Sequence, residues 1–231
     1  MSAVIEGRGM VAGYGPVPVL TGVDIHVGEG EVVALLGSNG AGKTTTLLSL
    51  AGELPLTQGE VLLDGKATKA PLHRRASQGV AFVTEERSIF RGLTTADNLR
   101  VGKCSESFAL ELFPELEKRM SIRGGMLSGG EQQMLTLARA LGRHPRLLMA
   151  DELSMGLAPL IVDRLLQAVA TSARERGTGV LLVEQHVRKV IKIADRIYVM
   201  RRGKVVLEGL ASELRGRIGE IEEQYLAGAA T

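Results

Sequence analysis

One segment of the chain has glycines, a lysine and threonines at a spacing that suits phosphate binding. It matches the pattern G-x-x-x-x-G-K-[ST] and lies between an apolar segment and a helix-like one, which is the context that this pattern requires. Glycines let backbone N–H groups converge on a phosphate, and the start of a helix adds favourable partial charge. We therefore predict a nucleotide-binding loop, because the context disfavours a chance glycine turn. Its residues are Gly37, Ser38, Asn39, Gly40, Ala41, Gly42, Lys43, Thr44 and Thr45.

Four side chains are expected around the phosphates of ATP, where they would contact the phosphates, Mg²⁺ or the attacking water. Lys43 would reach the β- and γ-phosphates, and Thr44 would place its hydroxyl on Mg²⁺. Elsewhere, the apolar residues 147–150 are followed by two acids. Acids at strand ends are commonly turn residues, but beside a phosphate loop a carboxylate in this position suits the Mg²⁺ shell. We therefore assign Asp151 to the metal and Glu152 to polarising the attacking water.

A serine followed by two glycines opens a third segment of interest. Ser128, Gly129, Gly130 and Glu131 precede apolar residues at helical spacing. A serine with a glutamate three residues later has the form of a capping box, so a well-capped helix is the simple explanation. Two glycines in a first turn are poor helix formers, however, and suit a backbone that must approach an anion closely. Because this segment lies at the far side of an inserted lobe, we expect it to serve ATP bound elsewhere than at Lys43.

The strands and helices that must position these residues follow from the hydrophobic pattern. Strands are expected at residues 19–27, 31–36, 59–66, 147–150 and 180–183, with a final strand pair turned at residues 202–203. Helices are expected directly after the glycine loop, ending at Gly52, and at residues 159–176. The strand at 31–36 is apolar after its first residue, which suits burial on both faces of a parallel sheet. Alternation of strands and helices in the second half predicts an α/β fold.

The length and composition indicate one domain over residues 1–231. We expect a nucleotide-binding core at about 1–85 and 143–210, a helical lobe at about 86–142 and a polar tail at 211–231. The 28 basic and 26 acidic residues give a net charge of +2 without a basic cluster, so nucleic acid is not expected as a partner. The single cysteine excludes an internal disulfide. No apolar run approaches the roughly 20 residues of a membrane-spanning helix.

Three segments together resemble the motifs of the ATP-binding-cassette (ABC) ATPases. GSNGAGKTT, LSGGEQQ and LLMADE look like the Walker A, signature and Walker B motifs, and their order and spacing cover nearly the whole chain. The resemblance implies a P-loop NTPase fold with a RecA-like parallel-sheet core, an N-terminal antiparallel β-subdomain and an inserted α-helical subdomain. It also implies that two such domains stack head to tail. The segment Ser128 to Glu131 would then close on ATP bound to the partner.

The resemblance assigns further positions. Tyr14 resembles the aromatic residue that stacks on adenine, and residues 154–158 resemble the D-loop at the dimer contact. Glu85 stands where many relatives carry a glutamine that contacts Mg²⁺ and water, and its carboxylate can still bind metal. Gln185 stands where a switch histidine is usual. Either Gln185 or the adjacent His186 takes that role, and we assign it to Gln185, which can donate a hydrogen bond to a γ-phosphate.

The segments VEQ, SMGLAP and ELFPEL resemble one branch of the family, the shorter ATPase subunit of branched-chain amino acid importers. This implies an ATPase at the cytoplasmic side of the cell membrane that powers import of branched-chain or other hydrophobic amino acids. The implied partners are a second, related ATPase subunit, transmembrane permease subunits and an extracytoplasmic substrate-binding protein.

Other functions remain open. The alternatives are an ATPase subunit of an importer for urea, amides or another solute, an exporter subunit, and a non-transport protein that uses ATP only as a dimerisation switch. Glu152 argues against the switch, because a pure switch needs no acid to activate water. The absence of a heptad run argues against a chromosome or DNA-repair ATPase.

Overall fold

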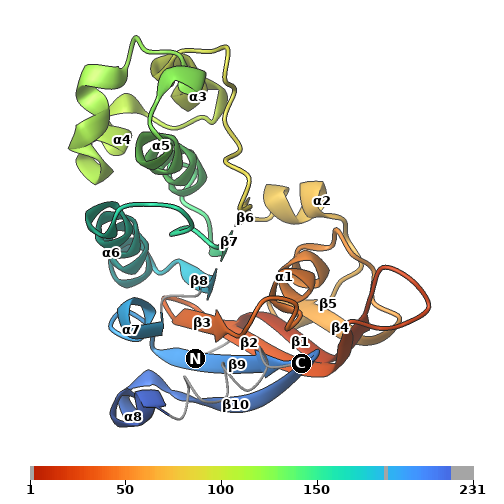
Figure 1. The fold of residues 1–231 in the computed structure, drawn as a ribbon. Helices are drawn as coiled ribbons and strands as arrows, with labels where there is room; N and C mark the ends of the chain where they lie inside the picture. The colour runs from red at the N-terminus through yellow and green to blue at the C-terminus, as the bar shows by residue number, and fades with distance from the viewer. Residues whose placement is uncertain (1–2, 185–186, 220–231) are drawn as a thin grey trace.

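The structure is a computed structural model that describes residues 3–184 and 187–219, and its strands form two sheets (Figure 1). The larger sheet has the strand order β10-β9-β3-β8-β7-β6. Its members are β3 (Val32–Leu36), β6 (Val80–Val83), β7 (Leu147–Asp151), β8 (Gly179–Val183), β9 (Arg196–Arg201) and β10 (Lys204–Leu210). All neighbouring pairs are parallel except β9 and β10, which form an antiparallel pair at one edge. The expected, largely parallel sheet is confirmed.

The three central strands β3, β8 and β7 are buried at every residue. In β3, Val33 and Leu35 pack on the side of α1 (Lys43–Ala51) and the smaller sheet, whereas Ala34 and Leu36 pack on the side of α6 (Pro159–Arg176). Successive residues of a strand point to opposite faces, so a strand covered on both sides must be apolar throughout. The uninterrupted apolar run that the sequence shows at this strand therefore has its expected cause.

The smaller sheet is antiparallel, with the order β2-β1-β4-β5. Its members are β1 (Ala3–Ala12), β2 (Leu20–Gly28), β4 (Gln58–Leu63) and β5 (Lys66–Ala67). Asp64 and Gly65 turn the β4–β5 hairpin with φ angles of 52° and 73°, which residues of these types adopt readily in a two-residue hairpin turn. Strand β1 was not predicted, because its charged and glycine residues from Glu6 to Gly9 interrupt the apolar alternation. The β1–β2 register also shifts between Gly7 and Met10.

A helical lobe is inserted between β6 and β7 and stands at the top of Figure 1. It contains α3 (Thr95–Val101), α4 (Glu106–Leu112) and α5 (Gly129–Leu141), with 3-10 turns at Pro114–Arg119 and Gly124–Met126. Nearer the C-terminal end lie α7 (Val187–Val190), α8 (Ala211–Leu214) and a 3-10 turn at Arg215–Arg217. In the part of the chain that the structure describes, no helix combines the length and apolar character needed to span a bilayer.

Helix α2 (Leu72–Ser77) is tied to the end of α1 by a buried arginine. Arg75 is 3% exposed and donates hydrogen bonds to the backbone carbonyls of Leu50, Thr68 and Ala70. Among the described residues, no carboxylate lies within ion-pair distance of it. Burial lowers the pKa of Arg75. The contact links the C-terminal end of the helix that follows the glycine loop to the segment leading into β6.

Candidate functional site

The glycine loop joins β3 to α1, and its path depends on glycine at two positions. Gly42 has a φ angle of 105°, which a residue with a side chain adopts only under strain. A Cβ atom at Gly37 would lie 2.6 Å from the carbonyl oxygen of Met200. The N-cap residue of α1 is Gly42, which has no side chain to cap the first turn, and this leaves N–H groups there for a phosphate. The loop lies between a strand and a helix, as its sequence pattern predicted.

Lys43 occupies the interior of this loop. It is 5% exposed, and its Nζ atom donates hydrogen bonds to the carbonyls of Gly37 at 2.9 Å and Ser38 at 3.1 Å. The same atom lies 4.0 Å from Oε1 of Glu152. Burial lowers the pKa of Lys43, while the negative charges of Glu152 and Asp151 act in the opposite direction. The ammonium group is thus held between the loop and the two acids at the end of β7.

Asp151, the last residue of β7, is 3% exposed, and its Oδ1 atom has no hydrogen-bond partner in the described part of the chain. Burial raises the pKa of Asp151, and the charges of Glu152 and Glu85 raise it further. A hydrogen bond with the Thr44 side chain and the charge of Lys43 oppose that rise. A buried carboxylate oxygen without a partner is costly, and a cation is the group that would satisfy it.

The donor set around Asp151 suits Mg²⁺. The ion is usually held by one or two carboxylates together with phosphate oxygens and water, rather than by a cage of protein ligands. Accordingly, a group of three His, Cys, Asp or Glu side chains that could hold a metal alone is not found within residues 3–184 and 187–219. The Thr44 hydroxyl, the unpartnered oxygen of Asp151 and the carboxylate of Glu85 are therefore compatible with a metal that also binds the nucleotide.

Glu152 has an unusual backbone conformation at the end of β7. Its φ angle is 48°, in the left-handed region that non-glycine residues seldom adopt. Its N–H group donates to the carbonyl of Val183 at 2.9 Å, which ties it to the end of β8. Strained backbone at such a position persists only when surrounding contacts fix it, and it is often found at functional sites.

Nine of the predicted site residues meet at one cavity of about 490 Å³. Tyr14 lines it from the loop between β1 and β2 and is 67% exposed. Glu85 lines it from the segment after β6, and Glu152 from the end of β7. Two further lining residues, Val19 and Met155, were not predicted for this cavity, although Met155 lies in the segment 154–158 that resembles the D-loop. The predicted loop residues that line the cavity are Asn39, Gly40, Gly42, Lys43, Thr44 and Thr45.

The other predicted loop residues, Gly37, Ser38 and Ala41, do not line the cavity, and the carbonyls of Gly37 and Ser38 accept the hydrogen bonds of Lys43. Gln185 and His186 lie outside the described residues, so the assignment of the switch role to Gln185 stays a prediction.

The start of α5 lies apart from this cavity. Ser128, Gly129, Gly130 and Glu131 are all described, and none of them lines it. Ser128 and Glu131 form a capping box: the Ser128 hydroxyl accepts from Glu131 N–H at 3.3 Å, and Glu131 accepts from Ser128 N–H at 2.8 Å. Added Cβ atoms at the two glycines would lie 3.0 Å from Arg87 and 3.1 Å from Ile161. The capping interpretation is therefore confirmed. Close packing against Arg87 and Ile161 is a further reason for glycine, rather than a larger residue, at both positions.

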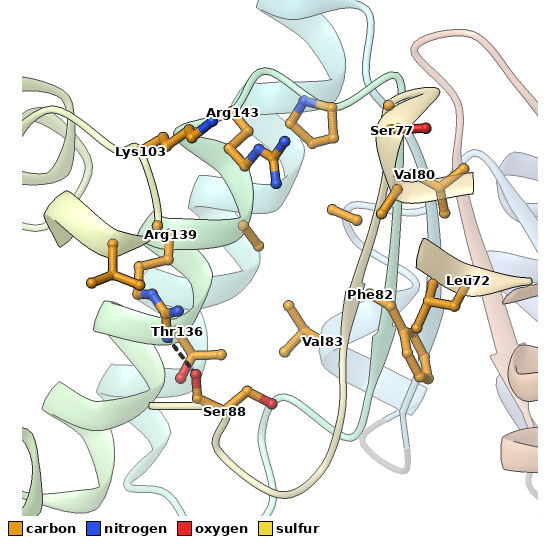
Figure 2. Close-up of a pocket in the computed structure, with 17 residues that line it drawn as sticks. Leu72, Ser77, Val80, Phe82, Val83, Ser88, Lys103, Thr136, Arg139 and Arg143 are labelled. Atoms are coloured by element: carbon orange, nitrogen blue, oxygen red, sulfur yellow. Dashed lines mark hydrogen bonds between the residues drawn. The ribbon is translucent and has the colours of Figure 1, made fainter. Parts of the chain in front are cut away.

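A separate cavity of about 480 Å³ lies between the helical lobe and the edge strand β6 (Figure 2). We call it the groove. Lys103, Arg139 and Arg143 line it, and no acidic side chain is among its described lining residues. The Arg139 guanidinium donates a hydrogen bond to the carbonyl of Ser88, shown as a dashed line in Figure 2. Because Ser88 is three residues after Glu85, one short segment borders both the groove and the nucleotide cavity.

The parallel sheet, the glycine loop after β3 and the acids at the end of β7 define a P-loop nucleotide-binding protein. The chain belongs to the ABC transporter family, whose sequence profile matches residues 20–154. It is therefore an ATPase subunit that binds nucleotide and couples ATP hydrolysis to transport.

Curated relatives and solved structures agree with this membership. The chain is 37% identical over 225 residues to the high-affinity branched-chain amino acid transport ATP-binding protein BraG of Pseudomonas aeruginosa, covering 93% of this chain and 96% of BraG. It is 32% identical over 225 residues to the lipopolysaccharide export system ATP-binding protein LptB of Escherichia coli, covering 92% of each. A solved ATP-binding subunit of an ABC transporter superimposes with a TM-score of 0.81 at 26% identity, covering 98% of this chain and 99% of that one.

Proposed function

We propose that this chain supplies one half of an ATP-hydrolysing site and that a second, related ABC ATPase subunit supplies the other half. The observation that carries the proposal is the separation of its two candidate phosphate-binding elements. Lys43 and Glu152 face one cavity, whereas the helix start at Ser128 lines no part of it. A partner stacked head to tail would bring its own serine-glycine helix start to the open side of this cavity. The partner is expected to be a different subunit, because the resemblance is to one of two ATPase subunits.

In the proposed half-site, the chain's own side chains orient the nucleotide and the attacking water. Lys43 would exchange the carbonyl oxygens of Gly37 and Ser38 for oxygens of the β- and γ-phosphates. Glu152 would accept a hydrogen bond from the attacking water and so orient it toward the γ-phosphate. The exposed ring of Tyr14 offers a flat surface for adenine. Gln185 would donate a hydrogen bond to the γ-phosphate.

Thr44, Glu85 and Asp151 are the residues proposed to hold Mg²⁺. When bound, the ion supplies positive charge against the β- and γ-phosphate oxygens. Within residues 3–184 and 187–219, the buried Oδ1 atom of Asp151 has no hydrogen-bond partner, and this supports the assignment most directly. Glu85 adds a second negative charge beside the phosphates, where the family more often has a neutral glutamine.

For the transported solute, we propose import of branched-chain or other hydrophobic amino acids. The similarity to BraG across nearly the whole of both chains supports this choice. The chain would lie at the cytoplasmic face of the membrane as a peripheral subunit, and an extracytoplasmic binding protein would deliver the solute. Export is the main alternative, since the similarity to LptB is only slightly weaker. Import of urea or amides also remains compatible with an ATPase subunit that need not touch the cargo.

The groove is the surface that we propose for the permease contact. Its lining of Lys103, Arg139 and Arg143 without an acidic side chain favours a permease segment that carries carboxylates. The hydrogen bond from Arg139 to Ser88 connects this surface to the segment that carries Glu85. Movement of the lobe during closure around ATP would then reach the permease through the groove.

ATP turnover of the chain, alone and with its partner ATPase and permeases, tests the proposal. Turnover should rise when both are added, and no stimulation by either would refute a shared site coupled to transport. Glu152→Gln should keep ATP binding, reduce hydrolysis at least about 100-fold and accumulate an ATP-bound dimer that size-exclusion chromatography detects. Glu175→Gln, an exposed change on α6, is the matched control. Unchanged turnover in the Glu152→Gln protein would reject the role of Glu152.

A further inference from the structure

Glu184 is a buried carboxylate that the proposed half-site leaves without a role. It follows β8 directly, is 1% exposed, and is absent from the described residues that line the nucleotide cavity. Both of its carboxylate oxygens accept hydrogen bonds from Ser154. The Ser154 N–H group donates to Oε1 at 3.0 Å, and the Ser154 hydroxyl donates to Oε2. The Glu184 side chain is thus bound to Ser154, in another segment, by two hydrogen bonds.

The segment that Glu184 holds begins at Glu152. Ser154 is two residues after Glu152, and Leu153 between them is 1% exposed. The Glu152 N–H group bonds to the carbonyl of Val183, the residue before Glu184. The end of β8 therefore fixes this segment twice, through its backbone at Glu152 and through a side chain at Ser154.

The conformation of Glu152 requires such support. A non-glycine residue in the left-handed region costs about 1–2 kcal/mol relative to the right-handed one, and Glu152 has a φ angle of 48°. Backbone bonds join Glu152 N–H to the carbonyl of Val183 and Met155 N–H to the carbonyl of Glu152. Without the bonds between Glu184 and Ser154, the turn after Glu152 could relax toward an ordinary conformation. Such a change would swing the Glu152 side chain away from its place 4.0 Å from the Lys43 ammonium. The bonds between Glu184 and Ser154 oppose this relaxation.

We propose that Glu184 is a positioning residue for ATP hydrolysis: by holding Ser154, it keeps the carboxylate of Glu152 aimed into the nucleotide cavity. The inference rests on the proposed role of Glu152. It assigns Glu184 no contact with ATP and no proton transfer. Loss of the two hydrogen bonds between Glu184 and Ser154 should therefore slow the chemical step and leave nucleotide binding nearly unchanged.

Three single variants separate positioning from other roles. Glu184→Ala removes both bonds and should lower kcat about tenfold or more, while KM for ATP stays within about twofold. Ser154→Ala removes only the hydroxyl and should lower kcat by a smaller factor, about threefold. Glu184→Gln should keep most of kcat, because its carbonyl oxygen can still accept the Ser154 N–H bond and its amide can donate to the hydroxyl. If the negative charge of Glu184 mattered instead, Glu184→Gln would be as impaired as Glu184→Ala.

A double-mutant cycle with Glu152→Gln tests whether Glu184 acts through Glu152. Residual hydrolysis is measured in single turnover with labelled ATP, and binding is measured separately with a fluorescent ATP analogue. In the Glu152→Gln background, Glu184→Ala should cost no further activity, because the carboxylate that it positions is already gone. Additive losses, or an unchanged kcat in Glu184→Ala, would overturn the inference. Glu175→Ala is the matched control.

The outcomes also distinguish this inference from the proposed function. If Glu152→Gln hydrolyses ATP normally, the proposed role of Glu152 fails, and the inference fails with it. If Glu152→Gln is inactive but Glu184→Ala is fully active, only the inference fails. If Glu184→Ala does not fold, the double-mutant cycle is run with Ser154→Ala and Glu152→Gln instead. Ser154→Ala deletes a single hydroxyl and does not change a buried charge. An additive cycle for Ser154→Ala would then reject the inference.

Discussion

Replacement of Asp151 by asparagine should stabilise the nucleotide-free chain and weaken its response to Mg²⁺ and ATP. The side chain is 3% exposed, and one of its oxygens has no hydrogen-bond partner in the described structure. A buried polar atom without a partner costs about 1–3 kcal/mol, and a charged one costs more. Asparagine keeps the shape and removes the charge, but it also loses the attraction to Lys43. We expect a net gain of about 1 kcal/mol, or roughly 2–4 °C in melting temperature for a chain of this size.

The pH dependence of this gain follows from the raised pKa of Asp151. Between its ordinary value of 3.8 and the raised value, the folded state binds more protons at Asp151 than the unfolded state does. Wild-type stability therefore falls as pH rises through that window, and the advantage of Asp151→Asn grows in the same direction. Thermal unfolding in EDTA at several pH values would show the two melting temperatures converging toward pH 4.

Addition of Mg²⁺ and ATP should reverse the order of stability. A ligand at about 100 times its dissociation constant stabilises a folded protein by about 2.7 kcal/mol, and Asp151→Asn should gain much less than the wild type. Asp195→Asn is the control, because the Asp195 carboxylate already accepts the Val32 N–H bond at 2.8 Å and asparagine can keep that bond. It should show no gain in EDTA. If the Asp151→Asn protein were clearly less stable than the wild type in EDTA, the prediction that the buried Asp151 carboxylate destabilises the nucleotide-free chain would be refuted.

Three further predictions concern other parts of the chain. Arg143→Glu should reduce stimulation of ATP turnover by the permeases about fivefold or more, because it places an acid in a groove proposed to receive acids, whereas Arg174→Glu on the exposed side of α6 should not. Equal stimulation of both variants would contradict the proposed docking. Arg75→Met should destabilise the chain by about 3 kcal/mol, since three backbone carbonyls lose their buried donor, and urea unfolding would measure the loss. Arg74→Met, at an exposed neighbour, should change stability by less than about 0.5 kcal/mol. Burial raises the pKa of Cys104 to about 11, so its thiol should react with a thiol reagent at pH 8 at least about tenfold more slowly in the folded chain than in denaturant. Equal rates would show that the thiol is accessible.

Elements whose residues carry a local signal could be predicted from the sequence. The helix at 159–176 was predicted with Pro159 in its first turn, where proline is well tolerated, and α6 has these bounds. Likewise, the glycine loop needs residue types that few other structures need, so Gly37 to Thr45 could be recognised before any fold was known. Asp151 was found by its position at the end of an apolar strand. Its unpartnered oxygen, by contrast, could be seen only in three dimensions.

Features that depend on distant contacts were missed. Strand β1 is held by pairing with β2 on one side and β4 on the other, and its own residues show little strand pattern. Glu184 ends an apolar strand, where an acid looks like an ordinary turn residue. Its partner Ser154 is 30 residues away in the chain, so no local pattern links the two. Tyr14 could be assigned only through family resemblance, since a tyrosine near a turn has no specific chemistry.

The hydrogen bonds of Lys43 to its own loop have a consequence for nucleotide capture. Two carbonyl oxygens of the loop accept hydrogen bonds from the ammonium, so side chain and loop are held together before ATP arrives. Binding would then exchange one set of acceptors for another and would require little ordering of the backbone. Preorganisation of this kind lowers the entropic cost of association. Such a loop would also return to the same conformation after each product release, ready for the next nucleotide.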